Sequence, residues 1–361
     1  MQASHEFAHL GLVLAWALTL GGCRSCRESQ AIPTVDGPET PALAAGLKGY
    51  LLYTVPGGHL MATDLPERKE RTLRKGDAGA THAVAGPDGA GRVVLVVSEG
   101  KQHSLKVMSI DGANERALFT RPGDALWDHV TGNSLALAPK GGNVAILSAT
   151  EGVQVGGALL DTGKLELWNV DTAKGEPLGF SAADYGLAFF PDGNKLAYVA
   201  LEPKALALTR LGGADALGTY WAQWTQIPVV HVRNLVTKSD EPLGIGQYPV
   251  VSSDGSYVLL SDGAGTLHRI ELSAKSHAVV TLPGYMGLGT VGATGTSVLY
   301  HARSTTGATP KTRPMSMGGE ETLHTIKLGK LDSSTSREFV TIADGVGIHS
   351  RVSFGLVPLV P

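Results

Sequence analysis

The feature that most constrains the fold of this chain is a recurring unit: an apolar run, a tight turn with Asp-Gly, and a second apolar run. β-branched and aromatic residues fill the runs, and the glycine permits a tight turn, so each unit predicts a β-hairpin. One hairpin cannot bury its own apolar face, and the repetition therefore predicts a stack of similar units. The clearest copies span residues 185–200, 248–262 and 82–98.

Composition agrees with a protein of many short strands and turns. The chain has 361 residues, of which 47 are glycine, and only 17% are charged. A glycine share this far above the usual value of about 7% is typical of a turn-rich protein. The formal net charge is -3, without a basic block or stripe. We therefore exclude a nucleic-acid partner.

The first residues predict an export signal. Residues 10–20 (LGLVLAWALTL) form an apolar run that is too short to span a bilayer as a helix. Leu20-Gly21-Gly22-Cys23 follows, and this segment resembles the bacterial lipoprotein box. The resemblance implies a signal peptide over 1–22 and a lipidated N-terminus at Cys23. One departure is that residues 1–9 contain no Lys or Arg.

Cys23 and Cys26 also have the C-x-x-C spacing of redox motifs. A thioredoxin-like motif opens a helix within a βαβ unit, whereas this pair follows an apolar export signal, so we favour lipidation. They are the only cysteines in the chain. Residues 23–47 carry proline and small residues without periodicity, which predicts a flexible tether. The folded domain is expected over 48–361.

Beyond the tether, the hairpins divide the chain into six units. Two further strands follow each inner hairpin; the best third strands are 165–170 and 229–235, and each leads to a Glu-Pro-Leu-Gly segment, at 176–179 and 241–244. Four antiparallel strands per unit predict an all-β fold, a β-propeller with six four-stranded blades.

The two ends of the folded domain complement each other. Residues 49–55, 59–65 and 70–74 supply three strands of a first unit that lacks its inner strand, and 349–354 is an inner-type strand without a unit. We expect the C-terminal strand to complete the first blade and close the ring, which removes exposed sheet edges.

The turn sequences resemble a known group, the six-bladed TolB-like propellers with WD40-like repeats. The residues that carry the resemblance are Phe190-Pro191-Asp192-Gly193, Gly86-Pro87-Asp88-Gly89 and Ser253-Asp254-Gly255, with weaker copies at 138–142 and 293–296. The resemblance implies architecture but says little about function, because propellers serve as enzymes, scaffolds and receptors alike.

Three insertions, at 151–163, 202–226 and 303–321, interrupt the connection between the second and third strands of their blades. In a propeller these connections lie on one face, where we expect partner binding. The candidate anchors are Tyr220, Trp221 and Trp224, with Trp127 on a link between blades. The alternative is that these rings only pack the insertion onto the blade edge.

A second candidate site is the mouth of the central channel. An aromatic or histidine residue stands near the start of each inner strand; these residues are His82, His129, Tyr185, Tyr248, Tyr285 and His349. The alternative is a set of hydrogen-bonded rim residues. We expect no metal here, because ligands must converge within about 2.1 Å of one ion.

The sequence thus favours a non-catalytic envelope lipoprotein, without catalytic residues, cofactor or metal, that binds a protein or glycan through the insertion-bearing face. We expect a monomeric propeller. Arg24 stands where an inner-membrane lipoprotein has aspartate, so the lipoprotein resemblance implies the outer membrane, facing the periplasm or the surface. The alternative is a propeller hydrolase or lyase acting on polysaccharide or peptide, with His82, His349 or Tyr248 as acid or base.

Overall fold

The computed structural model describes most of the chain beyond residue 48. The described residues are 49–55, 57–65, 69–122, 135–155, 158–211, 221, 224–263, 265–304, 323–332, 336–343 and 355–356. The predicted signal peptide, Cys23 and the tether lie outside them. The chain divides into two compact units, Met1–Gln30 and Ala31–Pro361, and all of the described residues belong to the second unit.

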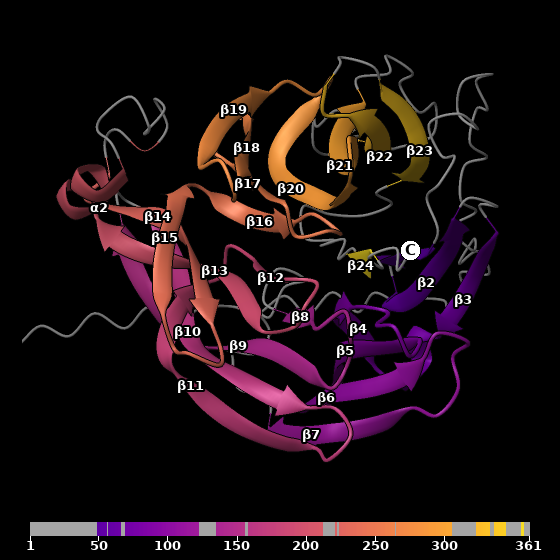
Figure 1. The fold of residues 1–361 in the computed structure, drawn as a ribbon. Helices are drawn as coiled ribbons and strands as arrows, with labels where there is room; N and C mark the ends of the chain where they lie inside the picture. Colours follow the sequence, from indigo (N-terminus) through magenta and orange to yellow (C-terminus); the bar gives the residue numbers. More distant parts are fainter. Residues whose placement is uncertain are drawn as a thin grey trace, which may run out of the picture. The chain divides into compact units, whose positions relative to one another are not determined.

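The described strands form six four-stranded sheets, and five of them use four consecutive strands (Figure 1). The second sheet contains β4 (Ala80–Ala85), β5 (Arg92–Glu99), β6 (Gln102–Ser109) and β7 (Arg116–Pro122). The third contains β8 (Leu135–Leu137), β9 (Asn143–Val155), β10 (Ala158–Asn169) and β11 (Lys174–Ala183). The fourth contains β12 (Leu187–Phe189), β13 (Lys195–Pro203), β14 (Gln226–Asn234) and β15 (Asp240–Ile245).

The other complete sheets follow the same order. The fifth sheet contains β16 (Gln247–Val251), β17 (Tyr257–Ser261), β18 (Leu267–Glu271) and β19 (Ser276–Val280). The sixth contains β20 (Tyr285–Thr294), β21 (Ser297–Ser304), β22 (Leu323–Lys330) and β23 (Ser336–Ala343). The short helices within the described ranges are η1 (Gly76–Ala78) and α2 (Lys204–Leu211). The prediction of an all-β propeller with four-stranded blades is confirmed.

The first sheet is built differently. It consists of β1 (Gly49–Val55), β2 (His59–Leu65) and β3 (Glu70–Arg74), and β24 (Gly355–Leu356) pairs antiparallel with β1. Within the described residues β24 contributes only Gly355 and Leu356, so five blades are complete, and the prediction of six full blades is corrected on this point. The predicted closing strand at 349–354 lies outside the described residues.

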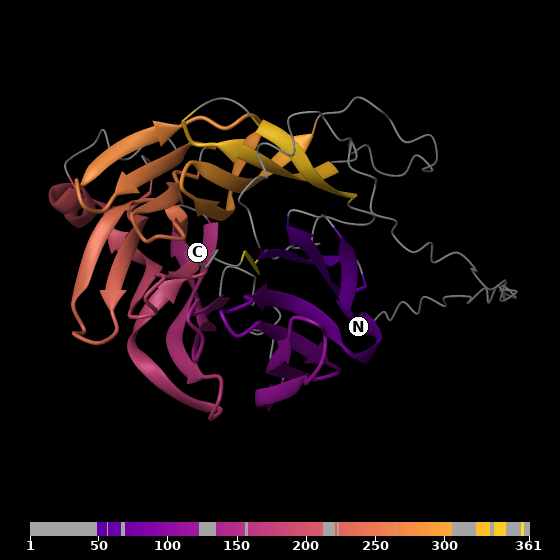
Figure 2. The ribbon, with the colours of Figure 1, turned by 45° about the vertical axis from the view of Figure 1, so that its right-hand side comes forward.

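The inner strands of successive sheets lie beside one another. β1 contacts β4, β4 contacts β8, and the series continues through β12 and β16 to β20. In Figure 2 the colours pass from indigo through magenta and orange to yellow from sheet to sheet, so the sheets follow one another in chain order. Inner strands pair with the second strand of their own sheet, as the hairpin units predict. The hairpins predicted at 185–200, 248–262 and 82–98 are therefore confirmed.

The core consists of apolar clusters between neighbouring sheets. Leu52 of β1 and Leu95 of β5 belong to one cluster, and Val94 of β5 and Ile146 of β9 belong to the next. Adjacent residues of β5 thus serve two different clusters, because side chains alternate between the two faces of a strand. Full burial of one such side chain stabilises the fold by roughly 1.5–3 kcal/mol. This sheet-on-sheet packing fixes the strands that carry the candidate sites.

The turn glycines explain why the Asp-Gly motif recurs. Gly193 and Gly255 have φ angles of 74° and 72°, a left-handed conformation that glycine adopts without steric cost. Their N–H groups donate to the Phe190 and Ser252 carbonyl oxygens, both at 2.9 Å. The turns therefore hold their own hairpins together.

Candidate functional site

The candidate site is the end of the propeller at which the inner strands begin, which we call the insertion face. Strand register defines it: Ala80 at the start of β4 pairs with Ser98 near the end of β5, and Gln247 at the start of β16 pairs with Ser261 at the end of β17. The connections after β5, β9, β13 and β17 therefore lie at this end. Two of the three insertions predicted to share one face, at 151–163 and 202–226, belong to this set, because they join β9 to β10 and β13 to β14.

Three of the predicted rim residues lie at or beside irregularities in the ladder. The register shifts between Thr81 and Ala83, where His82 lies, between Gln247 and Val250, where Tyr248 lies, and just after Tyr285. An extra residue in one strand of a pair bends that strand and redirects the side chain. These bulges interrupt the regular strand pairing at the points where the inner strands begin.

Tyr248 and Tyr185 are two rim residues that the structure brings together. Their rings meet edge to face, with centroids 5.9 Å apart and an interplanar angle of 84°. The Tyr248 N–H donates to the Tyr185 carbonyl oxygen at 2.5 Å, so the contact joins the fourth and fifth sheets. Both side chains are half-buried.

The backbone at Tyr248 is strained. Its φ angle is 54°, a left-handed conformation that a bulky residue seldom adopts. Gly186, next to Tyr185, is packed so tightly that an added Cβ would lie 2.9 Å from Pro249 Cδ and 3.0 Å from Tyr248 Cα. Such strain costs on the order of 1–3 kcal/mol and concentrates at functional sites. The surrounding contacts hold Tyr248 in this conformation.

The other rim residues make separate contacts. His82 is half-buried and faces His103, with ring centroids 6.5 Å apart, and the buried His103 Nδ1 lies 2.6 Å from Ser98 Oγ. The ring centroids of Tyr285 and Tyr300 are 6.2 Å apart, and the Tyr300 hydroxyl donates to the Pro283 carbonyl oxygen at 3.0 Å. The positions of Trp127, His129, Tyr220 and His349 lie outside the described residues.

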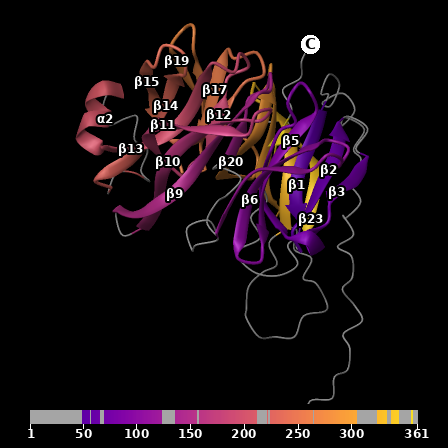
Figure 3. The ribbon, with the colours of Figure 1, turned by 90° about the horizontal axis from the view of Figure 1, so that it is seen from below.

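The tryptophans of the second insertion are buried. Trp221 and Trp224 are 1% and 5% exposed, and they form one cluster with Ala207 of α2 and Ile227 of β14. Helix α2 lies against β13, β14 and β15 in Figures 1 and 3. The two indoles therefore attach the insertion to the blade edge, as the packing alternative expects, and their role in partner binding stays a prediction.

The first insertion is a pair of extended strands rather than a loop. β9 and β10 remain paired from Glu151, opposite Thr162, to Val155, opposite Ala158. A bulge between Thr162 and Gly163 separates this extension from the blade. Most of the third insertion lies outside the described residues.

Sequence reasoning missed a partly buried polar cluster next to α2. His231 of β14 stands between two carboxylates: its Nε2 lies 2.9 Å from Glu202 Oε1, and its Nδ1 lies 3.3 Å from Asp240 Oδ2. Arg210 of α2 donates to the same Glu202 oxygen at 2.8 Å, and Tyr198 donates to Asp240 at 2.8 Å. Burial, followed by the hydrogen bond and charge of Asp240, raises the pKa of Tyr198, so its hydroxyl remains a donor.

The cluster couples the insertion to the blade, since Arg210 belongs to α2 and the other members belong to β13, β14 and β15. The available sequence signal was His231 within the apolar run Val229-Val230-His231-Val232. A histidine there predicts a buried partner but does not identify it.

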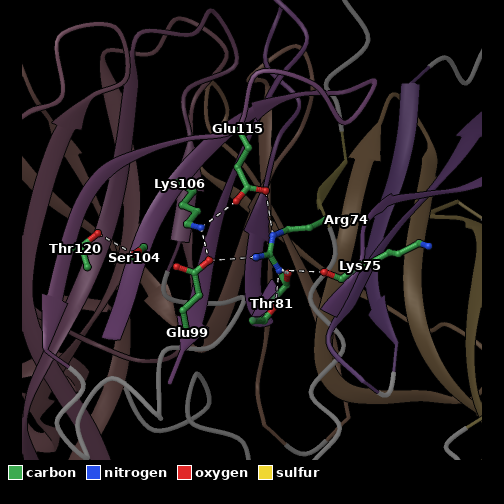
Figure 4. A network of polar contacts seen from close by, with 9 residues as sticks. Arg74, Lys75, Thr81, Glu99, Ser104, Lys106, Glu115 and Thr120 are labelled. Carbon is green, nitrogen blue, oxygen red and sulfur yellow. Dashed lines mark hydrogen bonds and ion pairs between the residues drawn. The ribbon is translucent and has the colours of Figure 1, made fainter. Parts of the chain in front are cut away.

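A second ion-pair network joins the first two sheets (Figure 4). Arg74 at the end of β3 has a side chain only 5% exposed and contacts Glu115 at 3.1 Å and Glu99 at 3.5 Å. Lys106 of β6 contacts the same two carboxylates, at 3.0 Å and 2.5 Å. Burial opposes ionisation of Glu115, but the Lys106 hydrogen bond and the Arg74 charge outweigh it and lower its pKa.

Two negative findings apply to the described residues. Within them, no group of three or more His, Cys, Asp or Glu side chains is arranged to hold a metal ion. In the same part of the chain, no helix has the length and apolar character needed to cross a membrane.

Comparison with known proteins shows a TolB-like β-propeller fold. The chain is similar to TolB from Acinetobacter baumannii, with a TM-score of 0.55 and 11% identity over 86% of this chain and 66% of that chain. It is also similar to a structure of a nidogen/laminin complex, with a TM-score of 0.53 and 12% identity over 85% of this chain and 98% of that chain.

At these identities the similarity establishes the fold alone. The chain spans 66% of the length of the TolB chain. No protein-family model matches the sequence, and no curated protein matches it significantly.

Proposed function

We propose that this protein is a non-catalytic binding scaffold of the bacterial cell envelope, which presents its insertion face to a protein or glycan partner. The observation that carries the proposal is the strained Tyr248, held against Tyr185 at the start of two inner strands. Half-buried tyrosines offer an apolar face and a polar hydroxyl with few rotatable bonds, which suits them to binding surfaces. The fold shared with a nidogen/laminin complex structure supports a protein partner.

The proposed attachment is a lipid on Cys23, followed by the tether over 23–47. Several acyl chains hold a protein on a membrane far more firmly than one chain does. Arg24 after the lipidated cysteine supports the outer membrane as the location. Replacing Cys23 with Ala should move the protein from the membrane fraction to the soluble fraction, and retention of membrane binding and of labelled palmitate would contradict the anchor.

We further propose that the propeller is a ring closed by the C-terminal strand, which pairs with the first sheet. The support is that β24 pairs with β1 and also contacts β20 and β4, the inner strands on either side. A closed ring fixes the inner-strand starts relative to one another, which a binding face requires.

The test of partner binding is a crosslinking pull-down from detergent-solubilised envelope. The variant is Tyr185→Ser with Tyr248→Gly, which removes both rings while glycine retains the positive φ at position 248. The matched control is Val236→Ser, which changes a 70% exposed side chain in the turn between β14 and β15, at the opposite end of the blade.

We expect the wild type and the control to capture the same protein or glycan and the double variant to lose it. A thermal unfolding curve must show that the double variant remains folded. Equal capture by all three folded proteins would contradict binding through the tyrosine pair.

A further inference from the structure

Two histidines on the fifth sheet form a pair that the proposed function does not use. β18 and β19 run antiparallel, with His268 opposite Val279 and Ile270 opposite His277, so the two histidines are diagonal neighbours on one face. Their rings stack with centroids 4.8 Å apart, and His268 Nδ1 lies 2.7 Å from His277 Nε2. His277 is exposed, whereas the His268 side chain is only 17% exposed.

Two imidazole nitrogens at this distance share one proton, because one nitrogen must donate and the other accept. A neutral imidazole is the form that binds a metal ion.

The carboxylate of Asp262 lies on the other side of His268. Its Oδ2 is 3.8 Å from His268 Nε2, and its Oδ1 accepts the Thr266 N–H at 2.9 Å, which fixes the carboxylate. Histidines that bind metals almost always direct their second ring nitrogen to such a carboxylate, carbonyl or water. At 3.8 Å this contact is electrostatic and not a hydrogen bond, and the negative carboxylate favours the Nε2–H tautomer, in which the lone pair of His268 lies on Nδ1.

Arg269, the residue after His268, directs its positive charge away from the histidine pair. Arg269 lies over the Tyr257 ring, with 4.0 Å to its centroid, and contacts Glu271 at 2.6 Å. Because side chains alternate along a strand, Arg269 lies on the opposite face of β18 from His268. Its charge therefore does not stand between the two histidines.

We propose that His268 Nδ1 and His277 Nε2 bind one divalent transition-metal ion of the zinc, nickel or copper class. The ion takes the place of the proton between them, and that proton moves to His277 Nδ1, so both imidazoles stay neutral. Metal–nitrogen distances of about 2.1 Å place two ligands roughly 3.0–3.4 Å apart, so the nitrogens must separate by less than about 1 Å. The exposed His277 can make this movement. Two imidazoles and solvent ligands suit such ions and not Mg²⁺ or Ca²⁺, which prefer oxygen.

The test uses the full chain, without a polyhistidine tag, in detergent. Cu²⁺ is titrated at pH 7.5 and followed by electron paramagnetic resonance, and Zn²⁺ binding is measured by calorimetry. The variants are His268→Gln, His277→Gln and Asp262→Asn, and the matched control is His59→Gln, whose ring lies on the first sheet.

We expect one equivalent of Cu²⁺ to show hyperfine coupling to two imidazole nitrogens. Either histidine variant should weaken binding at least about tenfold, Asp262→Asn should weaken it less, and the control should not change it. Binding should also weaken as the pH falls toward about 5.5, because protons compete for the ring nitrogens. Because His277 is exposed, its variant will fold.

Affinity and nitrogen coupling that are unchanged in His277→Gln would overturn the proposal. So would coupling to a single nitrogen in the wild type, since that result would leave the pair as a hydrogen bond only.

Discussion

At the residue scale, two copies of the same Pro-Asp-Gly turn differ in what their aspartate does. The Asp88 carboxylate is fully buried; its Oδ1 accepts the N–H groups of Ala90 and Arg92 at 2.9 Å, and its Oδ2 accepts Arg92 Nε at 2.8 Å. Asp192 is exposed and accepts the Asn194 N–H at 2.9 Å.

We expect Asp88→Ala to lower the free energy of unfolding by about 2–4 kcal/mol, because it leaves two backbone N–H groups and Arg92 Nε without their acceptor, while Arg92 keeps its ion pair with Asp171. Asp192→Ala should lower the free energy of unfolding by only about 0.5–1 kcal/mol, because water replaces the lost acceptor. Urea unfolding curves measure both. Equal losses would show that burial does not distinguish the two turns.

Residue identity alone did not reveal which aromatic rings are exposed. Trp221 and Trp224 in an insertion fit an interface anchor and a packing residue equally well, because both roles require a large amphipathic ring. Their burial depends on the packing of α2 against β14, which no local sequence pattern specifies. The strain at Tyr248 was equally hidden, because Gly246-Gln247-Tyr248 does not specify which residue takes a positive φ.

At the element scale, the network around Arg74 makes the contact between the first two sheets sensitive to acid. Because the pKa of Glu115 is lowered in the folded state, its ionisation stabilises the fold above the pKa of the unfolded chain. That contribution is lost as the pH falls through the folded-state pKa.

We expect the wild-type melting temperature to fall steeply from about pH 5 toward about pH 3, and Glu115→Gln to flatten that fall while lowering the melting temperature at neutral pH. The matched control is Glu176→Gln, an exposed residue of the outer strand β11. A Glu115→Gln curve parallel to the wild-type curve would assign the acid sensitivity to other carboxylates.

The insertion helix depends on the indole beneath it. Trp221→Ala should lower the free energy of unfolding by about 3–5 kcal/mol if the blade and helix unfold together, because it leaves a cavity between α2 and β14. If α2 detaches alone, limited proteolysis should instead cut within 204–225 much faster than in the wild type. Leu206→Ala is the control, since Leu206 lies on the same helix and is 48% exposed. A folded Trp221→Ala protein with wild-type stability and proteolysis would contradict this account.

At the scale of the whole molecule, the repeating turns made most of the architecture predictable. The strands predicted at 49–55, 59–65 and 70–74 coincide with β1, β2 and β3. Asp-Gly turns and alternating runs are local signals, so a single sequence suffices to place them. The closing contact was harder to place, because two residues at β24 carry no periodicity.

The importance of β24 for the ring can be measured by two truncations. Deleting 355–361 removes the strand whose backbone pairs with Leu51 and Leu52 of β1, whereas deleting 358–361 keeps that strand. The first deletion leaves an inner edge of β1 without its partner, and an open edge promotes pairing between molecules. We therefore expect the melting temperature to fall by several degrees, at about 2–4 °C for each kcal/mol of stability lost. Light scattering should show oligomers whose share grows with protein concentration.

The shorter deletion should remain monomeric with a wild-type melting temperature. If both truncated proteins behave alike, the pairing of β24 with β1 does not close the propeller, and the rim tyrosines must be held in place by the contacts between neighbouring sheets alone.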